Sequence, residues 1–86
     1  MLSKTFQALG DLNRQRILEL LKKKDMAVNE LAKNFSITLP SLSHHLNILK
    51  QAGLVVSRRN GQEIIYSLNL SVFEEVSKTI IKFFKK

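Results

Sequence analysis

The sequence predicts a mostly α-helical chain with one small β-hairpin, in the order α-α-α-α-β-β-α. Four segments with apolar residues at helical spacing precede residue 53. Two β-prone runs then flank Asn60-Gly61, and the last segment returns to helical spacing. Two short helices separated by a tight turn, directly before a hairpin, are typical of a helix-turn-helix followed by a wing.

The first two helices are predicted from their apolar spacing and their ends. Three residues at helical spacing define the first helix: Leu2, Phe6 and Leu9. Gly10 ends it, and Asp11 is expected to cap a second helix at about Leu12 to Lys23. The second helix turns four apolar residues inward: Ile17, Leu18, Leu20 and Leu21.

The third and fourth helices form the expected helix-turn-helix. The third carries Val28, Leu31, Ala32 and Phe35 at positions i, i+3, i+4 and i+7. Thr38 is a candidate N-cap for the fourth helix, where Pro40 is tolerated in the first turn. This helix should run to about Ala52 and stop at Gly53. Its inward stripe is expected to be Leu39, Leu42, Leu46 and Leu49, with Ile48 at the edge.

The hairpin is predicted from two runs, 54–59 and 62–68, joined by Asn60-Gly61 in a type I′ turn. A two-residue loop at this position would place three pairs opposite each other: Arg59 with Gln62, Arg58 with Glu63, and Val56 with Ile65. Ser71-Val72-Phe73-Glu74 has the form of a capping box and should open a fifth helix through Phe84.

The bulk composition bounds the class of protein. The 86 residues suffice for one domain, 1–86, with a modest core. There is no cysteine, no membrane-spanning apolar run and no signal-peptide pattern, so we expect a soluble cytoplasmic protein and no membrane association. The net charge of +7 favours an anionic partner such as nucleic acid, although it could also serve solubility alone.

The outward side of the fourth helix is unusual for a solvated face, because it has short polar donors and no carboxylates. No acidic residue lies between Ser36 and Gly61, a window that spans this helix and much of the hairpin. Such donors can reach phosphate oxygens and base edges. The sequence therefore predicts a surface that lies against a polyanion.

The adjacent His44 and His45 could also suggest a metal or catalytic site. Consecutive helical residues point about 100° apart, so the two cannot readily chelate one ion, as i, i+4 histidines can. They are the only histidines, and no cysteine or nearby carboxylate completes a shell. A catalytic histidine would need a nucleophile and an orienting carboxylate. We expect no metal, no cofactor and no enzyme activity, although one histidine could instead pack against the hairpin or cap a neighbour.

Three motifs resemble those of the ArsR/SmtB-type winged-helix repressors. They are PSLSHHLNILKQAGLV at 40–55, ALGDLNRQRIL at 8–18 and RNGQEIIYSLN at 59–69. Within that family the chain looks most like the small cysteine-free SdpR-like autorepressors. The resemblance implies a homodimer on a palindromic operator, with the fourth helix in the major groove and the wing on the flanking groove. The candidate DNA-binding residues are Thr38, Pro40, Ser41, Ser43, His44, His45, Asn47, Lys50, Arg58 and Arg59.

Departures from the family pattern bear on metal sensing. Residues 26–30 have no thiolate where the family has one sensing site, and residues 71–75 have no histidine where it has another. Leu12 also replaces a usual proline. A metal-responsive sensor with an unusual ligand set and a protein-interaction module remain alternatives. The resemblance also allows a protein partner that sequesters the regulator.

The terminal helices are expected to form the dimer interface. They carry more apolar residues than a monomer of this size should need, and these would otherwise leave an exposed patch. Pairing them across a two-fold axis would set the recognition helices about 34 Å apart, one turn of DNA. The alternative is that the last helix covers only its own core. The candidate interface residues are Leu2, Phe6, Leu9, Val76, Ile80, Phe83 and Phe84.

Overall fold

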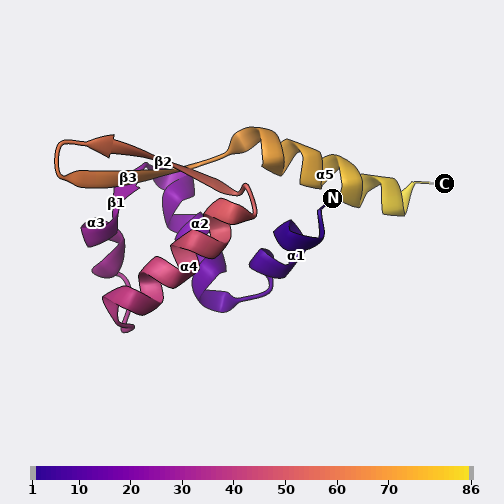
Figure 1. Cartoon of the computed structure of the whole chain (residues 1–86). Coiled ribbons are helices and arrows are strands. Elements are labelled where there is room, and N and C mark those ends of the chain that lie inside the picture. The colour runs from indigo at the N-terminus through magenta and orange to yellow at the C-terminus, as the bar shows by residue number, and fades with distance from the viewer. Residues whose placement is uncertain (1, 86) are drawn as a thin grey trace.

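A computed structural model describes residues 2–85 (Figure 1), so Met1 and Lys86 of the predicted domain lie outside the described residues. The elements are α1 (Ser3–Leu9), α2 (Leu12–Lys23), β1 (Met26–Ala27), α3 (Val28–Ala32), α4 (Leu39–Gln51), β2 (Val55–Asn60), β3 (Glu63–Leu68) and α5 (Leu70–Phe84). The predicted class, mostly helical with a hairpin, is confirmed.

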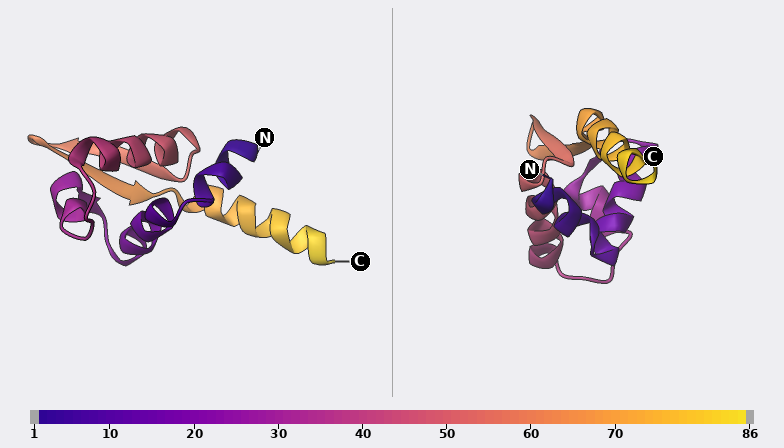
Figure 2. Two further views of the ribbon diagram at one scale, coloured as in Figure 1. Left: turned by 90° about the horizontal axis from the view of Figure 1, so that it is seen from below. Right: turned by 90° about the vertical axis from the view of Figure 1, so that its right-hand side faces the viewer.

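The molecule is elongated, with extents of 49 × 24 × 22 Å. The hairpin lies at one end, α2 and α4 occupy the middle, and α5 protrudes at the other end near α1 (Figures 1 and 2). The hydrophobic core lies between α2, α3, α4 and the base of the hairpin. Its fully buried large side chains are Ile17, Leu31, Leu42, Leu46, Leu49, Leu54 and Val55.

Local end signals account for the helix boundaries that were predicted correctly. The Asp11 side chain accepts a hydrogen bond from the Arg14 backbone N–H at 3.1 Å, and α2 spans the predicted residues. The Thr38 hydroxyl likewise accepts from the Ser41 N–H at 3.2 Å at the start of α4. After α4 the chain turns at Gly53, whose φ of +79° is a conformation that glycine adopts without strain.

The sheet has a strand that the sequence did not predict. Met26 and Ala27 pair antiparallel with Tyr66 and Ile65, which gives the strand order β1-β3-β2. A two-residue strand has no periodicity of its own to detect. It exists because β3 offers a free edge beside it.

The predicted hairpin register is wrong by two residues, because the turn lies one residue later than predicted. Asn60 pairs with Glu63, and the two-residue turn is Gly61-Gln62 rather than Asn60-Gly61. Only Gly61 has a positive φ, +66°, as the first central position of a type II′ turn requires. Consequently Arg58 lies opposite Ile65, not Glu63, and Arg59 lies opposite Ile64.

Three smaller expectations are also wrong. Leu39 is 53% exposed, because it lies in the first turn of α4, beyond the edge of the core. Phe35 lies after the end of α3 and packs against the core from the connecting turn. The Ser71 capping box does not form, since α5 begins at Leu70 with Asn69 as N-cap, and the Ser71 hydroxyl donates to the Asn69 side chain at 3.1 Å.

Candidate nucleic-acid interface

Helix α4 is held with one side buried and the other open. Leu42, Leu46 and Leu49 are at most 1% exposed and fix the orientation of the helix against the core. The opposite side carries the exposed polar side chains of Ser43, His44, Asn47 and Lys50, as expected from the sequence, and Thr38 and Pro40 are exposed at the start of the helix. Ser41 is half-buried. This open side follows directly from the burial of the leucine stripe.

His45 does not lie on the open side of α4, so its predicted placement there is wrong. Its side chain is only 13% exposed, and Nδ1 lies 3.2 Å from an Arg14 guanidinium nitrogen and 3.8 Å from Asp11 Oδ1. Both partners belong to the start of α2. His45 is therefore part of the contact between α2 and α4, and it packs against α2 rather than against the hairpin.

The sequence analysis did not identify Gln51 and Arg14 as residues of the candidate site. Gln51 is exposed and follows His44 and Asn47 at i+7 and i+4, so it shares their side of α4. This spacing could have identified it. Arg14 could not have been found in the same way, because its contact with His45 joins residues 31 positions apart.

The two arginines of the wing have different surroundings. Arg58 donates to Asp25 Oδ2 at 3.1 Å and to the Ser67 hydroxyl at 3.1 Å. Arg59 has no hydrogen-bond or ion-pair partner within residues 2–85. Arg59 is therefore the wing cation that is free to meet a phosphate group.

Acidic residues outside the acid-free window approach it in space. Asp25 pairs with Arg58, and Asp11 lies beside His45. The exposed side of α4 has no such carboxylate partner within the described residues. Within the described residues, the open side of α4 and Arg59 are therefore the parts of the sequence window without an ion-pair partner.

Two carboxyl groups at helix starts have lowered pKa values. The pKa of Asp11 falls below its ordinary 3.8, mainly because its side chain accepts the Arg14 backbone N–H, with smaller contributions from the charges of His45 and Arg14. The pKa of Glu30 falls below 4.5, mainly through its contact with Lys24, whose Nζ lies 3.1 Å from Oε2. Both carboxylates help to hold helix starts.

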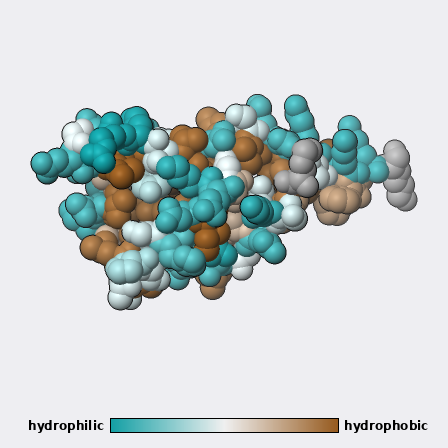
Figure 3. All heavy atoms as spheres, viewed as in Figure 1, coloured by the Kyte–Doolittle hydropathy of each residue, from teal (hydrophilic) through white to brown (hydrophobic). Residues whose placement is uncertain are grey.

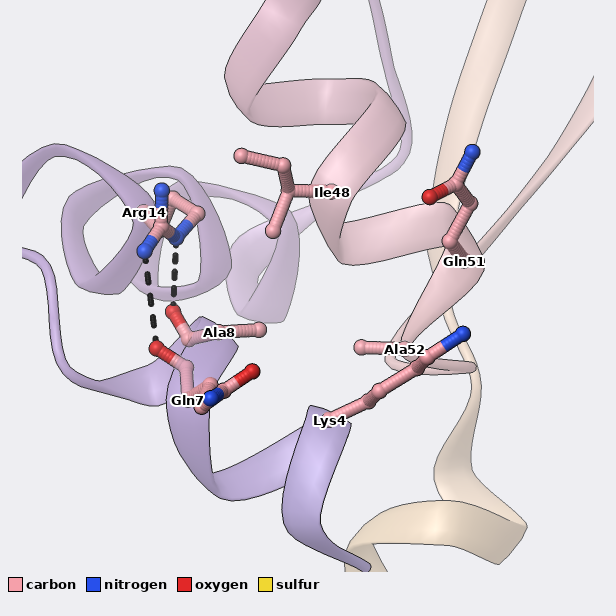
Figure 4. A pocket seen from close by; sticks show the side chains of 7 residues that line it. All are labelled: Lys4, Gln7, Ala8, Arg14, Ile48, Gln51 and Ala52. Atoms are coloured by element: carbon pink, nitrogen blue, oxygen red, sulfur yellow. Dashed lines mark hydrogen bonds between the residues drawn. The ribbon is translucent and has the colours of Figure 1, made fainter.

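A cavity of about 410 Å³ lies between α1 and α4 (Figure 4). Its wall includes the cations Lys4 and Arg14, and Arg14 donates Nε to the Ala8 carbonyl at 2.8 Å and a terminal nitrogen to the Gln7 carbonyl at 3.4 Å. The cavity therefore adjoins the junction at which Arg14 contacts α1.

The described residues offer no evident metal shell. No cluster of three or more His, Asp or Glu within residues 2–85 could hold an ion, and the chain has no cysteine. None of the helices in this part of the chain has the length and apolar content that a bilayer crossing requires.

The predicted dimer residues differ in exposure. Val76 is buried within its own chain, and Leu2 and Leu9 are half-buried. Phe6 and Ile80 are about 40% exposed. Phe83 and Phe84 are 78% and 84% exposed, on the end of α5 that protrudes from the body.

Sequence comparison identifies relatives along nearly the whole chain. Residues 11–57 match the family described as "Bacterial regulatory protein, arsR family". The chain is 44% identical over 85 residues to the transcriptional repressor SdpR of Bacillus subtilis (strain 168), covering 99% of this chain and 94% of that protein. It is 32% identical over 79 residues to the arsenical resistance operon repressor of Staphylococcus xylosus, covering 92% and 76% respectively.

Structural comparison gives the same result. An ArsR-like transcriptional regulator from Rhodococcus sp. RHA1 superposes with a TM-score of 0.86 at 30% identity, over 95% of this chain and 77% of that one. The homodimeric winged helix-turn-helix DNA-binding domain of Mb0332 from Mycobacterium bovis superposes with a TM-score of 0.76 at 28% identity, over 95% and 80%. The resemblance, the fold and the absence of an enzyme assignment are thus confirmed: the chain belongs to the arsR family of bacterial regulatory proteins, which are transcriptional regulators and not enzymes.

Proposed function

We propose that the chain is a sequence-specific repressor that binds a palindromic double-stranded DNA operator as a homodimer. The observation that carries this proposal is the open, acid-free side of α4, held outward by three fully buried leucines. Helix α4 would enter the major groove, where Ser43, His44 and Asn47 can reach base edges. The wing would bring Arg59 to the phosphates of the flanking groove. Such a regulator acts on DNA in the cytoplasm.

The repressor assignment is supported by the relatives. Two of the proteins to which the chain is similar are named as repressors, one of them 44% identical over nearly its full length. A repressor needs no further domain, because a protein that occupies an operator can exclude other proteins from it. A partner protein that sequesters the regulator would then release the operator.

The homodimer is supported by the exposure of one apolar stripe of α5. The stripe is buried at Val76, 42% exposed at Ile80 and 78% exposed at Phe83, so it continues past the body of its own chain. In the space-filling view the protruding end carries a hydrophobic cluster (Figure 3). A second copy related by a two-fold axis would bury both stripes. Mb0332, a similar structure, is described as homodimeric.

We further propose that this regulator does not sense metal ions. Its thiol-free composition and scattered carboxylates support this, since transition-metal sensing sites need clustered nitrogen, sulfur or carboxylate donors.

The proposal is tested by selecting fragments of genomic DNA that bind the purified full chain. We expect enrichment of an inverted repeat and an affinity that falls steeply with salt. Fragments with no common sequence would contradict specific recognition. Adding Zn²⁺, Ni²⁺ or Cu⁺ should leave the operator affinity unchanged, and a shift would contradict only the absence of metal sensing.

Variants separate base reading from phosphate contact. Asn47→Ala should reduce the preference for operator over random DNA by about 1–3 kcal/mol. Arg59→Ala should weaken binding to both DNAs alike and flatten the salt slope by about one. Lys78→Ala, which removes an exposed cation of α5, is the matched control. It should change neither the preference for operator DNA nor the salt slope. An unchanged preference in Asn47→Ala would contradict base reading by α4.

A further inference from the structure

Arg14 joins three helices through one guanidinium group. It belongs to the first turn of α2, and it donates Nε to the Ala8 carbonyl and a terminal nitrogen to the Gln7 carbonyl, both at the end of α1 (Figure 4). Its other terminal nitrogen lies 3.2 Å from Nδ1 of His45, in the middle of α4. A fixed cation thus stands between the first helix and the helix that would read DNA.

This contact determines which nitrogen of His45 carries the proton. An arginine guanidinium has only N–H donors and does not lose its proton in proteins. It can therefore hydrogen-bond only to a ring nitrogen that accepts. When the ring is neutral and Arg14 donates to Nδ1, the proton resides on Nε2, whereas the Asp11 carboxylate, 3.8 Å from the same Nδ1, would suit a protonated Nδ1 instead.

The protonated nitrogen remains accessible. Nε2 of His45 has no hydrogen-bond partner within residues 2–85. In the same part of the chain no buried side-chain nitrogen or oxygen lacks a partner, so Nε2 must be reached by solvent although the side chain is only 13% exposed. In this tautomer His45 therefore presents a single N–H donor to solvent at the contact between α2 and α4.

We propose that Arg14 is a positioning residue that fixes His45 as the Nε2–H tautomer, so that α4 offers a hydrogen-bond donor there. A donor suits N7 of either purine, guanine O6, thymine O4 and phosphate oxygens, and it cannot pair with the amino groups of cytosine or adenine. The link also ties this donor to the carbonyl end of α1. The DNA part of this inference rests on the proposed function, whereas the tautomer does not.

The tautomer is measured directly by long-range ¹H–¹⁵N spectra of the neutral imidazole rings. The His44→Gln variant, which leaves one histidine, removes any ambiguity of assignment. We expect a protonated Nε2 and an unprotonated Nδ1 for His45. Arg14→Met should give a mixture of tautomers. A protonated Nδ1 of His45 in the His44→Gln variant, in which Arg14 is retained, would overturn the proposal.

DNA binding tests the consequence. Arg14→Met should lower the ratio of operator to random-DNA affinity about tenfold, the effect of one good base contact. In the His45→Asn background, which lacks the Nε2 donor, the same change should alter the ratio by less than about twofold. His45→Gln, whose amide N–H extends toward the Nε2 position, should keep more of the preference than His45→Asn.

Equal losses from Arg14→Met in both backgrounds would show that Arg14 does not act through His45, and would overturn its positioning role. If the chain bound no DNA while the spectra still reported Nε2–H, the proposed function would fail and the tautomer assignment would stand.

Discussion

Replacing Phe83 by alanine should dissociate the proposed dimer without unfolding the chain. Phe83 is 78% exposed in the single chain, so its ring contributes little to the packing of its own body. It lies seven residues after Val76 and therefore continues the same side of α5. The loss should fall on contact with a second copy.

The size of the effect follows from the exposed area. With 78% of an aromatic side chain free, roughly 150 Å² per copy is available to an interface. If half of it is buried, about 2 kcal/mol per copy is gained at about 25 cal/mol per Å². A two-fold interface contains the residue twice, so Phe83→Ala should raise the dimer Kd by about a thousandfold, or about 4 kcal/mol.

Sedimentation equilibrium over a range of protein concentrations measures this Kd. Ile81→Ala is the matched control, because Ile81 is 54% exposed and lies on a different side of α5. Circular dichroism should report the same helix content in both variants. The reasoning is refuted if the unaltered chain is a monomer at every concentration, or if Phe83→Ala and Ile81→Ala shift the Kd equally.

Three further predictions concern stability. Leu46→Ala should lower the free energy of unfolding by about 2–5 kcal/mol in urea denaturation, because Leu46 is fully buried; a loss below about 1 kcal/mol would contradict its place in the core. Gly53→Ala should lower the free energy of unfolding by about 1–2 kcal/mol because of the φ of +79° at this position. The added Cβ would meet Val72 Cγ2 at an ordinary 3.5 Å, so the cost comes from the backbone conformation alone. An unchanged melting temperature would contradict this strain. Because the folded pKa of Asp11 is lowered, its contribution is complete above 3.8 and is lost as pH falls through the lower folded value. The melting temperature of Asp11→Asn, which keeps a capping side chain, should therefore fall less than that of the unaltered chain between neutral pH and about pH 3, and equal falls would count against this linkage.

The features that the sequence predicted well depend on neighbours in the chain. The start of α2 follows from Asp11, whose cap partner is three residues away, and the end of α4 follows from Gly53. The buried stripe of α4 follows from helical spacing and holds for Leu42, Leu46 and Leu49. Leu39 breaks the rule only because the core does not extend to the first turn.

The features that were missed depend on partners distant in sequence. His45 turns inward to contact Arg14, which lies 31 positions earlier in the sequence. Arg58 is paired with Asp25, which lies 33 positions earlier. Strand β1 needs the edge of β3. The hairpin register also depends in part on tertiary contacts. In the observed register Ile65 of β3 pairs with Arg58 of β2 on one side and with Ala27 of β1 on the other. Spacing along one element cannot report such contacts.

The central claim is that the open side of α4 contacts DNA, and amide ¹H–¹⁵N spectra recorded with the selected operator duplex test it most directly. The largest shifts should fall on residues 41–47 of α4 and around Arg59 in the wing, with little change along the middle of α5. Shifts concentrated on α5, with α4 unchanged, would contradict the claim.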